Sequence, residues 1–586
     1  MSRLLPLLVA VPLFGAALLV AAGRRLPRLP AEAFAGVLAG ATAALALTMS
    51  ARPSPVHDEW VGGWDPDRGP AVGIVLVGDG VALGLVALVS LLATAVLIYS
   101  WRYFDERTLR HTGAFPALIL LFQAGMCGFV LAGDLFNAFV FFELMGVVAY
   151  ALTGHRVEEP KAVQGALTFG VLNSLGAYAT LIGIALLYAR TGELSMRAIG
   201  QRLAVREGPD ALVLAAFALV LTGLLVKAAA FPFHFWLPDA HAVAPTPVCM
   251  LLSGVMVELG VYGVARVYGT VFSGPGGIPP DDAGRALIVL GALTGLVGAV
   301  MSWQQRHVKR LLAYATVAHT GLFLVGLGLT SPKATEGVAL YIVGHAGAKA
   351  ALFACAGILL DRYGSIDEHD LYGKARELPL VSALFAVGGL ALAGMPPFGT
   401  GLGKAAVEEE GGVLLTALCV AVSAATGAAV LRVTARVFWG LGRRPHGTRA
   451  DETTGTDEEP ETRGPLGRVP VTMRAVPVAL LLGALAAGLV PGFAGAVARA
   501  VGDMVPGGPA EPVRWTAAGL VLGGTSTLLA VATAAVALCR PATGEGHPWI
   551  APLRGLHSGH VGDYVAWLLI GTTALGALAW PAPGAG

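Results

Sequence analysis

Apolar stretches of about 20 residues recur along almost the whole chain, and they constrain its fold more than any other feature. A helix that crosses the hydrocarbon core of a bilayer needs roughly 20 consecutive apolar residues. The sequence contains sixteen such candidate spans: 4–22, 32–49, 73–99, 115–132, 135–153, 166–189, 211–230, 247–270, 285–303, 311–330, 337–359, 379–395, 411–438, 475–497, 515–538 and 563–580. Because a backbone inside lipid must satisfy its own hydrogen bonds, these spans predict an all-α polytopic membrane protein with about 14–16 transmembrane helices.

The charge and cysteine content excludes several classes of function. Charged residues make up only 13% of the 586 residues, against about 25% in soluble domains. The net charge is +1, so there is no basic excess to neutralise phosphates, and we expect no nucleic-acid partner. The five cysteines lie singly in apolar runs, and GTGLGK at 399–404 lacks the first glycine and the Ser or Thr of a phosphate-binding loop. We therefore expect no metal, no cofactor and no redox site in this chain.

Basic residues cluster in alternate connecting segments, as they do in the cytoplasmic loops of membrane proteins. The segments that carry them are 24–28, 102–110 and 306–310, and the intervening segments lean acidic. Several arginines in 190–210 weaken the pattern, because they lie in a segment predicted to face outward. The distribution predicts a multi-pass protein of the plasma membrane with both termini outside.

Two candidate spans combine an ionisable lysine with a proline. Lys227 precedes Pro232 by five residues, and Lys404 follows Pro396 and Pro397. Proline removes a backbone hydrogen bond, and an opened turn at membrane depth usually lines a cavity. Two interrupted helices in corresponding positions point to a transport site built from structural repeats, so we expect broken helices at these prolines.

Six ionisable side chains lie within or next to apolar spans, and at membrane depth each costs at least about 2.5–3.5 kcal/mol. They occupy five helices of the central part of the chain: Glu143, Lys227, Glu258, His345, Lys349 and Lys404. A single one is compatible with snorkelling or a structural ion pair, but the set favours a proton relay. The spacing of His345 and Lys349 places both on one helix face. His319 is a further candidate, for which a structural hydrogen bond and a relay role both stay open.

A stretch at 441–470 has a different composition, rich in acidic residues, Gly, Pro and Thr. This composition is typical of a flexible loop that buries too little apolar surface to fold. The loop separates thirteen candidate spans from a tail of three.

The segment KAAAFPFHFWLPDAHAVAPTPVCMLLSGVMVELGVYG at 227–263 resembles the signature of a family of antiporter-like membrane subunits. That family is shared by respiratory complex I, group 4 membrane-bound hydrogenases and Mrp-type cation/proton antiporters. Similar segments surround Glu143 and occur at 306–321, 344–353 and 394–404, so the resemblance covers roughly 115–440. We therefore divide the chain into N-terminal helices, an antiporter-like core, the acidic loop and C-terminal helices, at 1–110, 111–440, 441–470 and 471–586.

The resemblance implies two inverted five-helix repeats, each with a broken helix and a half-channel, joined by a central polar axis. By position, Glu143 and Lys227 would form the ion pair of the first half-channel. His345 and Lys349 would lie on the central axis, and Lys404 would be the terminal proton-exchange residue. Many members have a lysine where this chain has Glu258, so the middle of the relay differs here.

The leading functional interpretation is a proton-translocating subunit of a redox-driven pump of the complex I or hydrogenase type, with electron transfer in other chains. The alternative is a subunit of an Mrp-type cation/proton antiporter, in which Na⁺ stays open as the exchanged ion. A structural membrane subunit and an unrelated solute carrier are the remaining interpretations. The first two require other membrane subunits as partners within the bilayer.

Overall fold

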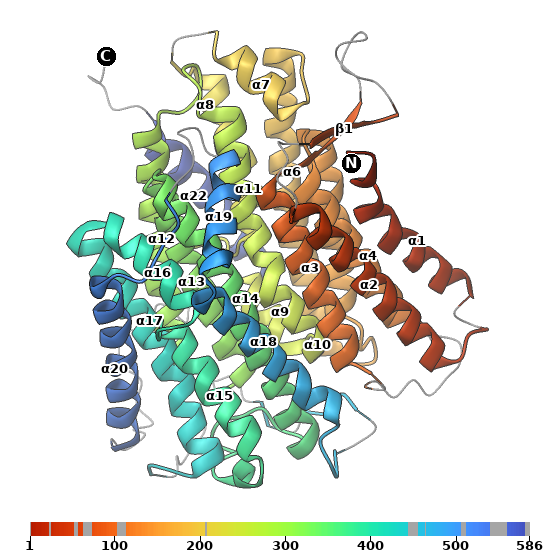
Figure 1. Cartoon of the computed structure of the whole chain (residues 1–586), viewed down its shortest axis with the longest axis vertical. Helices are drawn as coiled ribbons and strands as arrows, with labels where there is room; N and C mark the ends of the chain where they lie inside the picture. Colours follow the sequence, from red (N-terminus) through yellow and green to blue (C-terminus); the bar gives the residue numbers. More distant parts are fainter. Residues whose placement is uncertain are drawn as a thin grey trace.

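The computed structural model describes residues 2–22, 25–51, 57–62, 73–101, 103, 113–205, 208–443, 455–456, 458–462, 465–504, 511–539 and 560–580. They form a bundle of long helices that run roughly side by side (Figure 1). Thirteen described helices are long and apolar enough to cross a membrane, and three shorter apolar helices, Leu7–Ala22, Ala211–Lys227 and Pro379–Leu392, bring the total to sixteen. Each falls on one predicted span, so the prediction of an all-α polytopic membrane protein is confirmed.

The first half of the chain contains the elements η1 (Ser2–Leu4), α1 (Leu7–Ala22), α2 (Arg28–Ser50), β1 (His57–Val61), β2 (Ile74–Gly78), α3 (Gly80–Tyr99), α4 (Ala114–Leu131), α5 (Leu135–Thr153), α6 (Pro160–Thr191), α7 (Met196–Leu203), α8 (Ala211–Lys227), α9 (Trp236–Val243), α10 (Thr246–Leu251), η4 (Leu252–Met256), α11 (Val257–Val267) and η5 (Tyr268–Phe272). Several helices begin at an aspartate whose carboxylate accepts a hydrogen bond from a free backbone N–H of the first turn, which stabilises the helix start. Asp79, Asp134 and Asp210 do this for α3, α5 and α8.

The second half contains α12 (Pro280–Gln304), α13 (Val308–Gly328), α14 (Pro332–Tyr363), η6 (Lys374–Glu377), α15 (Pro379–Leu392), α16 (Gly399–Glu410), α17 (Gly412–Thr434), η7 (Ala435–Trp439), α18 (Val471–Leu489), α19 (Pro491–Met504), α20 (Ala517–Cys539) and α22 (Val561–Leu578). The segments η4, η5 and η7 are single π-helical turns. Such turns widen a helix locally and often mark functional positions.

The antiparallel hairpin β1–β2 and helix α7 lie at the same end of the bundle as the N-terminus (Figure 1). We call this the outer end, because the charge pattern predicts that it faces outward. The opposite, inner end carries the basic segment that begins α13, where Arg306, Lys309 and Arg310 all form ion pairs.

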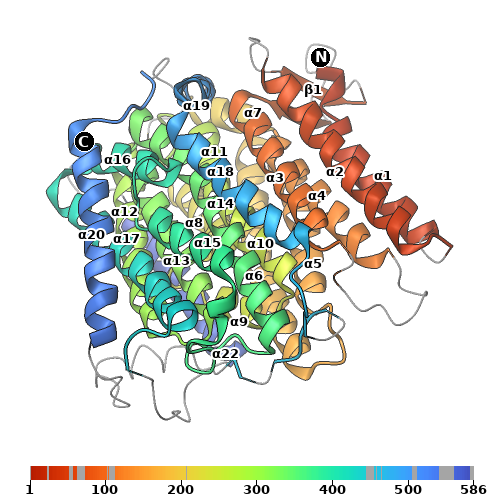
Figure 2. The ribbon, with the colours of Figure 1, turned by 60° about the horizontal axis from the view of Figure 1, so that its bottom comes forward.

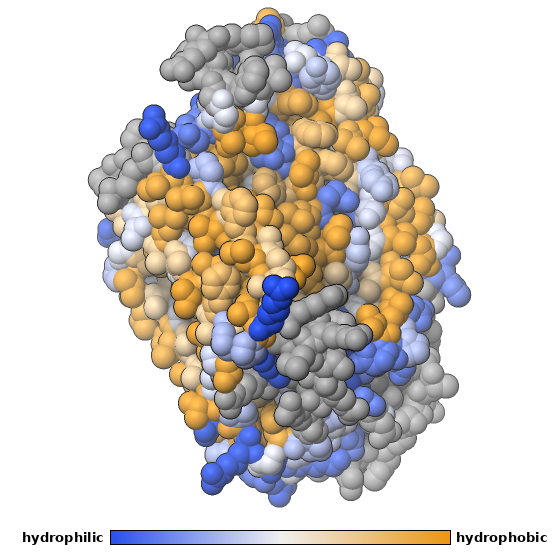
Figure 3. Space-filling view, turned by 90° about the vertical axis from the view of Figure 1, so that its right-hand side faces the viewer, coloured by the Kyte–Doolittle hydropathy of each residue, from blue (hydrophilic) through white to orange (hydrophobic). Residues whose placement is uncertain are grey.

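A broad hydrophobic band covers the face of the bundle shown in Figure 3, and hydrophilic residues gather toward its ends. Large apolar side chains of the N-terminal helices, such as Phe14, Val20 and Val37, are exposed. A continuous exposed apolar surface of this kind is unfavourable in water but is what a bilayer requires. The band therefore marks the lipid-facing surface.

The C-terminal helices pack along the core. Helices α18 and α19 run diagonally across one face and contact α14 and α3 (Figure 2). Helix α20 packs against α17 and α16, and α22 packs against α8, α6 and α12. The tail thus contacts both halves of the core.

Part of the acidic stretch 441–470 differs from the flexible loop that its composition predicts; residues 444–454, 457 and 463–464 lie outside the described residues. Glu461 is buried, and its carboxylate accepts hydrogen bonds from Lys309 Nζ at 2.7 Å and from the Thr246 backbone N–H at 2.7 Å. Composition could not reveal this, because the lysine that neutralises Glu461 lies on a distant helix.

Glycines allow α12 and α13 to approach closely. A Cβ atom at Gly291 would lie 2.7 Å from the carbonyl oxygen of Gly321 and 2.8 Å from the backbone nitrogen of Val325. These are backbone atoms, which cannot turn aside as a flexible side chain can. Small residues at such contacts are typical of membrane helices, whose association depends on close packing.

We expect Gly291→Val to destabilise the protein by about 1–3 kcal/mol, because the new side chain would push α12 away from α13. The change is measurable as a lower thermal unfolding midpoint of the detergent-solubilised protein. Gly84→Val is the matched control, since a Cβ at Gly84 meets nothing within 4 Å. Equal unfolding midpoints for the two variants would contradict the packing argument.

Candidate proton-transfer site

The first broken helix is formed by α8 and α9, with residues 228–235 between them in non-helical conformation and Pro232 in that segment. Lys227 is the last residue of α8 and is fully buried. The break is held by two hydrogen bonds to backbone atoms, from Trp236 Nε1 to the Val226 carbonyl at 2.8 Å and from the Phe231 N–H to Thr294 Oγ1 at 2.9 Å. Lys227 therefore lies at an opened turn in the interior of the protein.

The ammonium group of Lys227 lacks a hydrogen-bond partner in the described part of the chain. Its nitrogen lies 4.3 Å from the centre of the Phe142 ring, a cation–π contact that compensates only part of the cost of burying a charge. A Cβ atom at Gly146 would lie 3.3 Å from the same nitrogen, so the glycine leaves room for the lysine.

Glu143 lies on α5 next to Phe142 and is half-buried. The resemblance implied an ion pair between Glu143 and Lys227, but among the described residues the two make no ion pair within 4.0 Å. Their charges nevertheless interact over a longer distance. The structure thus places the predicted partners near each other without joining them.

The central group contains Glu258 on α11, His319 on α13, and His345 and Lys349 on α14, all fully buried. Nδ1 of His345 lies 2.5 Å from Oε1 of Glu258. The rings of His319 and His345 lie 5.0 Å apart between their centres. Lys349 donates a hydrogen bond to the Leu312 carbonyl at 2.5 Å. The structure therefore brings together four of the predicted residues from three helices.

The second broken helix is formed by α15 and α16, with Pro396 and Pro397 in the segment between them. Lys404 on α16 is buried and donates to Oε1 of Glu408 at 2.9 Å and to Ser526 Oγ at 3.0 Å. Unlike Lys227, this lysine has both a carboxylate and a hydroxyl partner. The hydroxyl comes from α20 in the C-terminal tail.

Several polar residues of the site were not predicted from the sequence. Nδ1 of His319 lies 2.7 Å from the hydroxyl of Tyr341, and its Nε2 lies 3.1 Å from Thr426 Oγ1. Tyr341 precedes His345 by four residues and Glu408 follows Lys404 by four, so helical spacing could have identified both. Thr426 and Ser526 carried no comparable signal.

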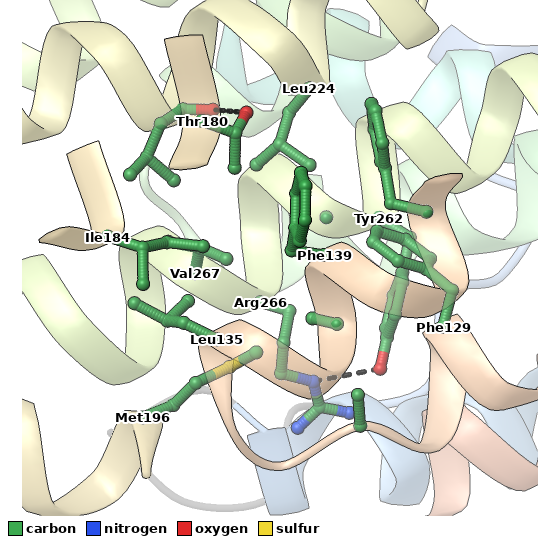
Figure 4. Close-up of a pocket in the computed structure, with 15 residues that line it drawn as sticks. Phe129, Leu135, Phe139, Thr180, Ile184, Met196, Leu224, Tyr262, Arg266 and Val267 are labelled. Carbon is green, nitrogen blue, oxygen red and sulfur yellow. Dashed lines mark hydrogen bonds between the residues drawn. The ribbon is translucent and has the colours of Figure 1, made fainter. Parts of the chain in front are cut away.

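A small cavity of about 30 Å³ lies between α4, α5, α6, α8 and α11. Apolar side chains line most of it, with Thr180, Tyr262 and Arg266 as polar members (Figure 4). Arg266 donates to the Tyr262 hydroxyl at 2.9 Å and forms an ion pair with Asp79 at 2.5 Å. Phe142, which covers Lys227, also lines this cavity.

The inner end carries a network of buried ion pairs. Glu368, in the connection between α14 and α15, bonds to Arg432 at 2.8 Å and to Arg436 at 2.8 Å. Burial raises the pKa of Glu368, but the charges of the two arginines outweigh burial and hold that pKa below its ordinary value of 4.5. Asp367 is paired similarly with Arg306 at 2.6 Å.

Within the ranges that the structure describes, no group of three or more His, Cys, Asp or Glu could hold a metal ion.

Comparison with known proteins places this arrangement in a family. Residues 132–430, which include all the candidate relay residues, match the family described as NADH:quinone oxidoreductase/Mrp antiporter, transmembrane region. The chain belongs to this family. NADH-quinone oxidoreductase subunit N of Desulforudis audaxviator is 35% identical over 408 residues, covering 68% of this chain and 78% of the relative. A Na⁺/H⁺ antiporter protein of Bacillus subtilis is 27% identical over 449 residues, covering 75% of this chain and 88% of the relative.

Solved structures of the family share the fold. A chain of the Mrp complex from Dietzia sp. aligns with a TM-score of 0.76 at 24% identity, over 98% of this chain and 60% of that chain. A chain of respiratory complex I from Thermus thermophilus aligns with a TM-score of 0.63 at 25% identity, over 84% of this chain and 99% of that chain. The inverted relation of the two repeats stays a prediction.

We expect Glu368 to make stability depend on pH. Because its pKa is lowered in the folded protein, its contribution is fully present above pH 4.5 and is lost as the pH falls below that value. Glu368→Gln leaves two buried arginines without their carboxylate, which costs roughly 3–5 kcal/mol at neutral pH. The variant should show a lower thermal unfolding midpoint at pH 7, and its midpoint should change less than that of the unaltered protein as the pH falls below 4.5.

Glu377→Gln is the control for this experiment, because Glu377 pairs with Arg362 at the protein surface, where an ion pair contributes little. An acid dependence that is unchanged in Glu368→Gln would show that other carboxylates govern it.

Proposed function

We propose that this chain is a proton-translocating subunit of a redox-driven membrane complex of the complex I or hydrogenase type, in the plasma membrane. Electron transfer would take place in partner subunits. One observation carries the proposal: a series of buried ionisable groups extends across the family-matched core, from Lys227 through the central group to Lys404. Burying so many ionisable groups is costly, and moving protons is a function that requires them.

The first step of the relay depends on the unpaired state of Lys227. A buried cation without a hydrogen-bond partner is sensitive to any charge that approaches it. If Glu143 moves into contact, the protonated lysine is stabilised, and if Glu143 withdraws, a proton is driven toward the next basic group. The half-exposed position of Glu143 on α5 leaves it free to respond to a partner subunit.

The later steps follow hydrogen-bonded groups. Glu258 and His345 share a hydrogen bond at 2.5 Å, and His319 is bonded to Tyr341 at 2.7 Å. Imidazole and phenol groups both donate and accept, so each can receive a proton on one side and release one on the other. In this proposal the central group carries protons between the two broken helices, and Lys404 receives them at the far side.

The alternative proposal is a subunit of an Mrp-type cation/proton antiporter. A specific observation supports it: the Na⁺/H⁺ antiporter protein of Bacillus subtilis aligns over 75% of this chain at 27% identity, beside 68% at 35% identity for the oxidoreductase relative. In that case the relay would couple proton flow to cation exchange without electron transfer. Both alternatives use the same residues, so the partner subunits distinguish them.

We expect the tagged chain, extracted from native membranes in a mild detergent, to co-purify with iron–sulfur or nickel–iron proteins, as identified by mass spectrometry. Those partners would support the redox-driven pump, because this chain carries no cysteine pattern for a cluster of its own. Small hydrophobic subunits alone would support the antiporter. A chain that purifies without partners would contradict both.

We expect Lys227→Ala to lower proton translocation roughly tenfold or more, because the relay loses the group that starts it. Glu143→Gln should have a similar effect. The rate is measured with a fluorescent pH probe in membrane vesicles that contain the assembled complex, with assembly verified on native gels. Lys161→Ala, which changes an exposed lysine, is the control. Normal proton flux in assembled Lys227→Ala complex would instead indicate a structural subunit.

A further inference from the structure

We propose that Glu408 takes the proton from Lys404 and passes it to the outer surface, so that α16 forms the outlet of the relay. This inference rests on the proposed function and adds one residue, Glu408, to it. In the transfer, the Lys404 ammonium loses a proton to the Glu408 carboxylate, which leaves a neutral amine and a carboxylic acid. The acid then releases its proton to water that leads toward the outer end, and Lys404 is reprotonated from the central group.

The first observation is the position of the Glu408 carboxylate. Its side chain is fully buried, and one oxygen accepts a hydrogen bond from Lys404 Nζ at 2.9 Å. The other oxygen, Oε2, is buried without a hydrogen-bond partner in the described part of the chain. A carboxylate whose role is only to neutralise a lysine normally has both oxygens satisfied, because an unpaired buried oxygen is costly. The free oxygen is available for the proton or for a water molecule.

The second observation is the path beyond Glu408. Helix α16 continues to its end at Glu410, and each residue adds about 1.5 Å along the axis, so Glu408 lies about 6 Å beyond Lys404. Glu409 pairs with Lys333 at 2.9 Å, and Glu410 is bonded to Ser331 Oγ at 3.1 Å. Both partners belong to the start of α14 at the outer end.

Exposure rises along this path. The side chain of Lys404 is 1% exposed and that of Glu408 is 0% exposed, whereas Glu409 and Glu410 reach 19% and 34%. Three acidic residues thus follow Lys404 within the last two turns of α16, and the two nearest the helix end are partly exposed. Such a series can pass protons outward, with water completing the last step.

The first half of the core has a different arrangement on the outer side of Lys227. Helix α5 begins at the outer end, where Asp134 pairs with Ser195 just before α7. Between that end and Lys227, the cavity of Figure 4 is lined mostly by apolar side chains, and its polar members Thr180, Tyr262 and Arg266 include no carboxylate that could carry a proton as an acid. Phe142 separates Lys227 from this cavity. The contrast favours the second half as the outlet.

The test uses native membrane vesicles with the whole complex and chromosomal variants of this chain. Glu408→Gln keeps the shape and can still accept a hydrogen bond from Lys404, but it cannot carry a proton. We expect proton translocation to fall roughly tenfold or more in assembled complex, and its dependence on the pH of the outer compartment to disappear. Glu408→Asp should restore part of the rate. Glu511→Gln, which changes an exposed acid outside the core, is the control.

The outcomes separate the two proposals. If Glu408→Gln translocates protons normally while Lys227→Ala does not, the role proposed for Glu408 is wrong and the proposed function stands. If both variants translocate normally, the proposed function is also wrong.

A second measurement on the unaltered complex applies if Glu408→Gln does not assemble. A hydrophobic carbodiimide reacts with protonated carboxyl groups in apolar surroundings, and mass spectrometry identifies the modified residue. Glu408 should become labelled, with Glu143 as a second carboxyl within the membrane for reference. An unlabelled Glu408 beside a labelled Glu143 would overturn the proposal, because a permanently ionised counter-ion does not react.

Discussion

The cost of keeping a charge away from water governs the arrangement of this protein. Most ionised groups in the described interior have a partner of opposite charge or a hydrogen-bonding group, and these partners come from helices distant in sequence. Glu461 reaches Lys309 and Glu368 reaches two arginines of α17 and η7. Lys227 differs, since only an aromatic ring lies over it. An unpaired buried cation is a high-energy feature, and a protein retains such features where function uses them.

The two lysines at the broken helices are therefore in different physical states. Lys227 has an aromatic neighbour and a distant carboxylate, so a small movement of Glu143 changes its environment strongly. Lys404 is already paired with Glu408 and Ser526, so its environment changes less when other groups move. In the relay that we propose, this difference favours transfer from the sensitive lysine to the stabilised one.

The helices were predictable because a spanning helix must match the thickness of the bilayer, and each of the sixteen spans overlaps an apolar helix. Two spans were drawn too long, since 73–99 begins with strand β2 and 475–497 crosses the break between α18 and α19. Contacts within one helix were also within reach, since His345 and Lys349 share a face, and the same spacing links Tyr341 to His345 and Glu408 to Lys404. Contacts between different helices could not be predicted. The bond between Glu258 and His345 joins residues 87 positions apart, and no periodicity encodes which distant helix lies opposite. The burial of Glu461 in the acidic stretch could not be predicted for the same reason, because its partner Lys309 lies on a distant helix.

The C-terminal tail lies outside the family match, yet it covers both broken helices. On α22, Tyr564 stacks on Phe235 at 4.7 Å between ring centres, beside the first break. On α20, Ser526 donates to the Ala393 carbonyl at 2.7 Å, inside the second break. Opened turns leave backbone carbonyls without helical partners, and within a membrane those groups must be satisfied by neighbouring protein. Because the same hydroxyl also accepts from Lys404, the tail couples the geometry of the break to the position of the lysine. A movement of α20 would therefore alter the surroundings of Lys404, and with them the proposed proton transfer, without any change in the core itself.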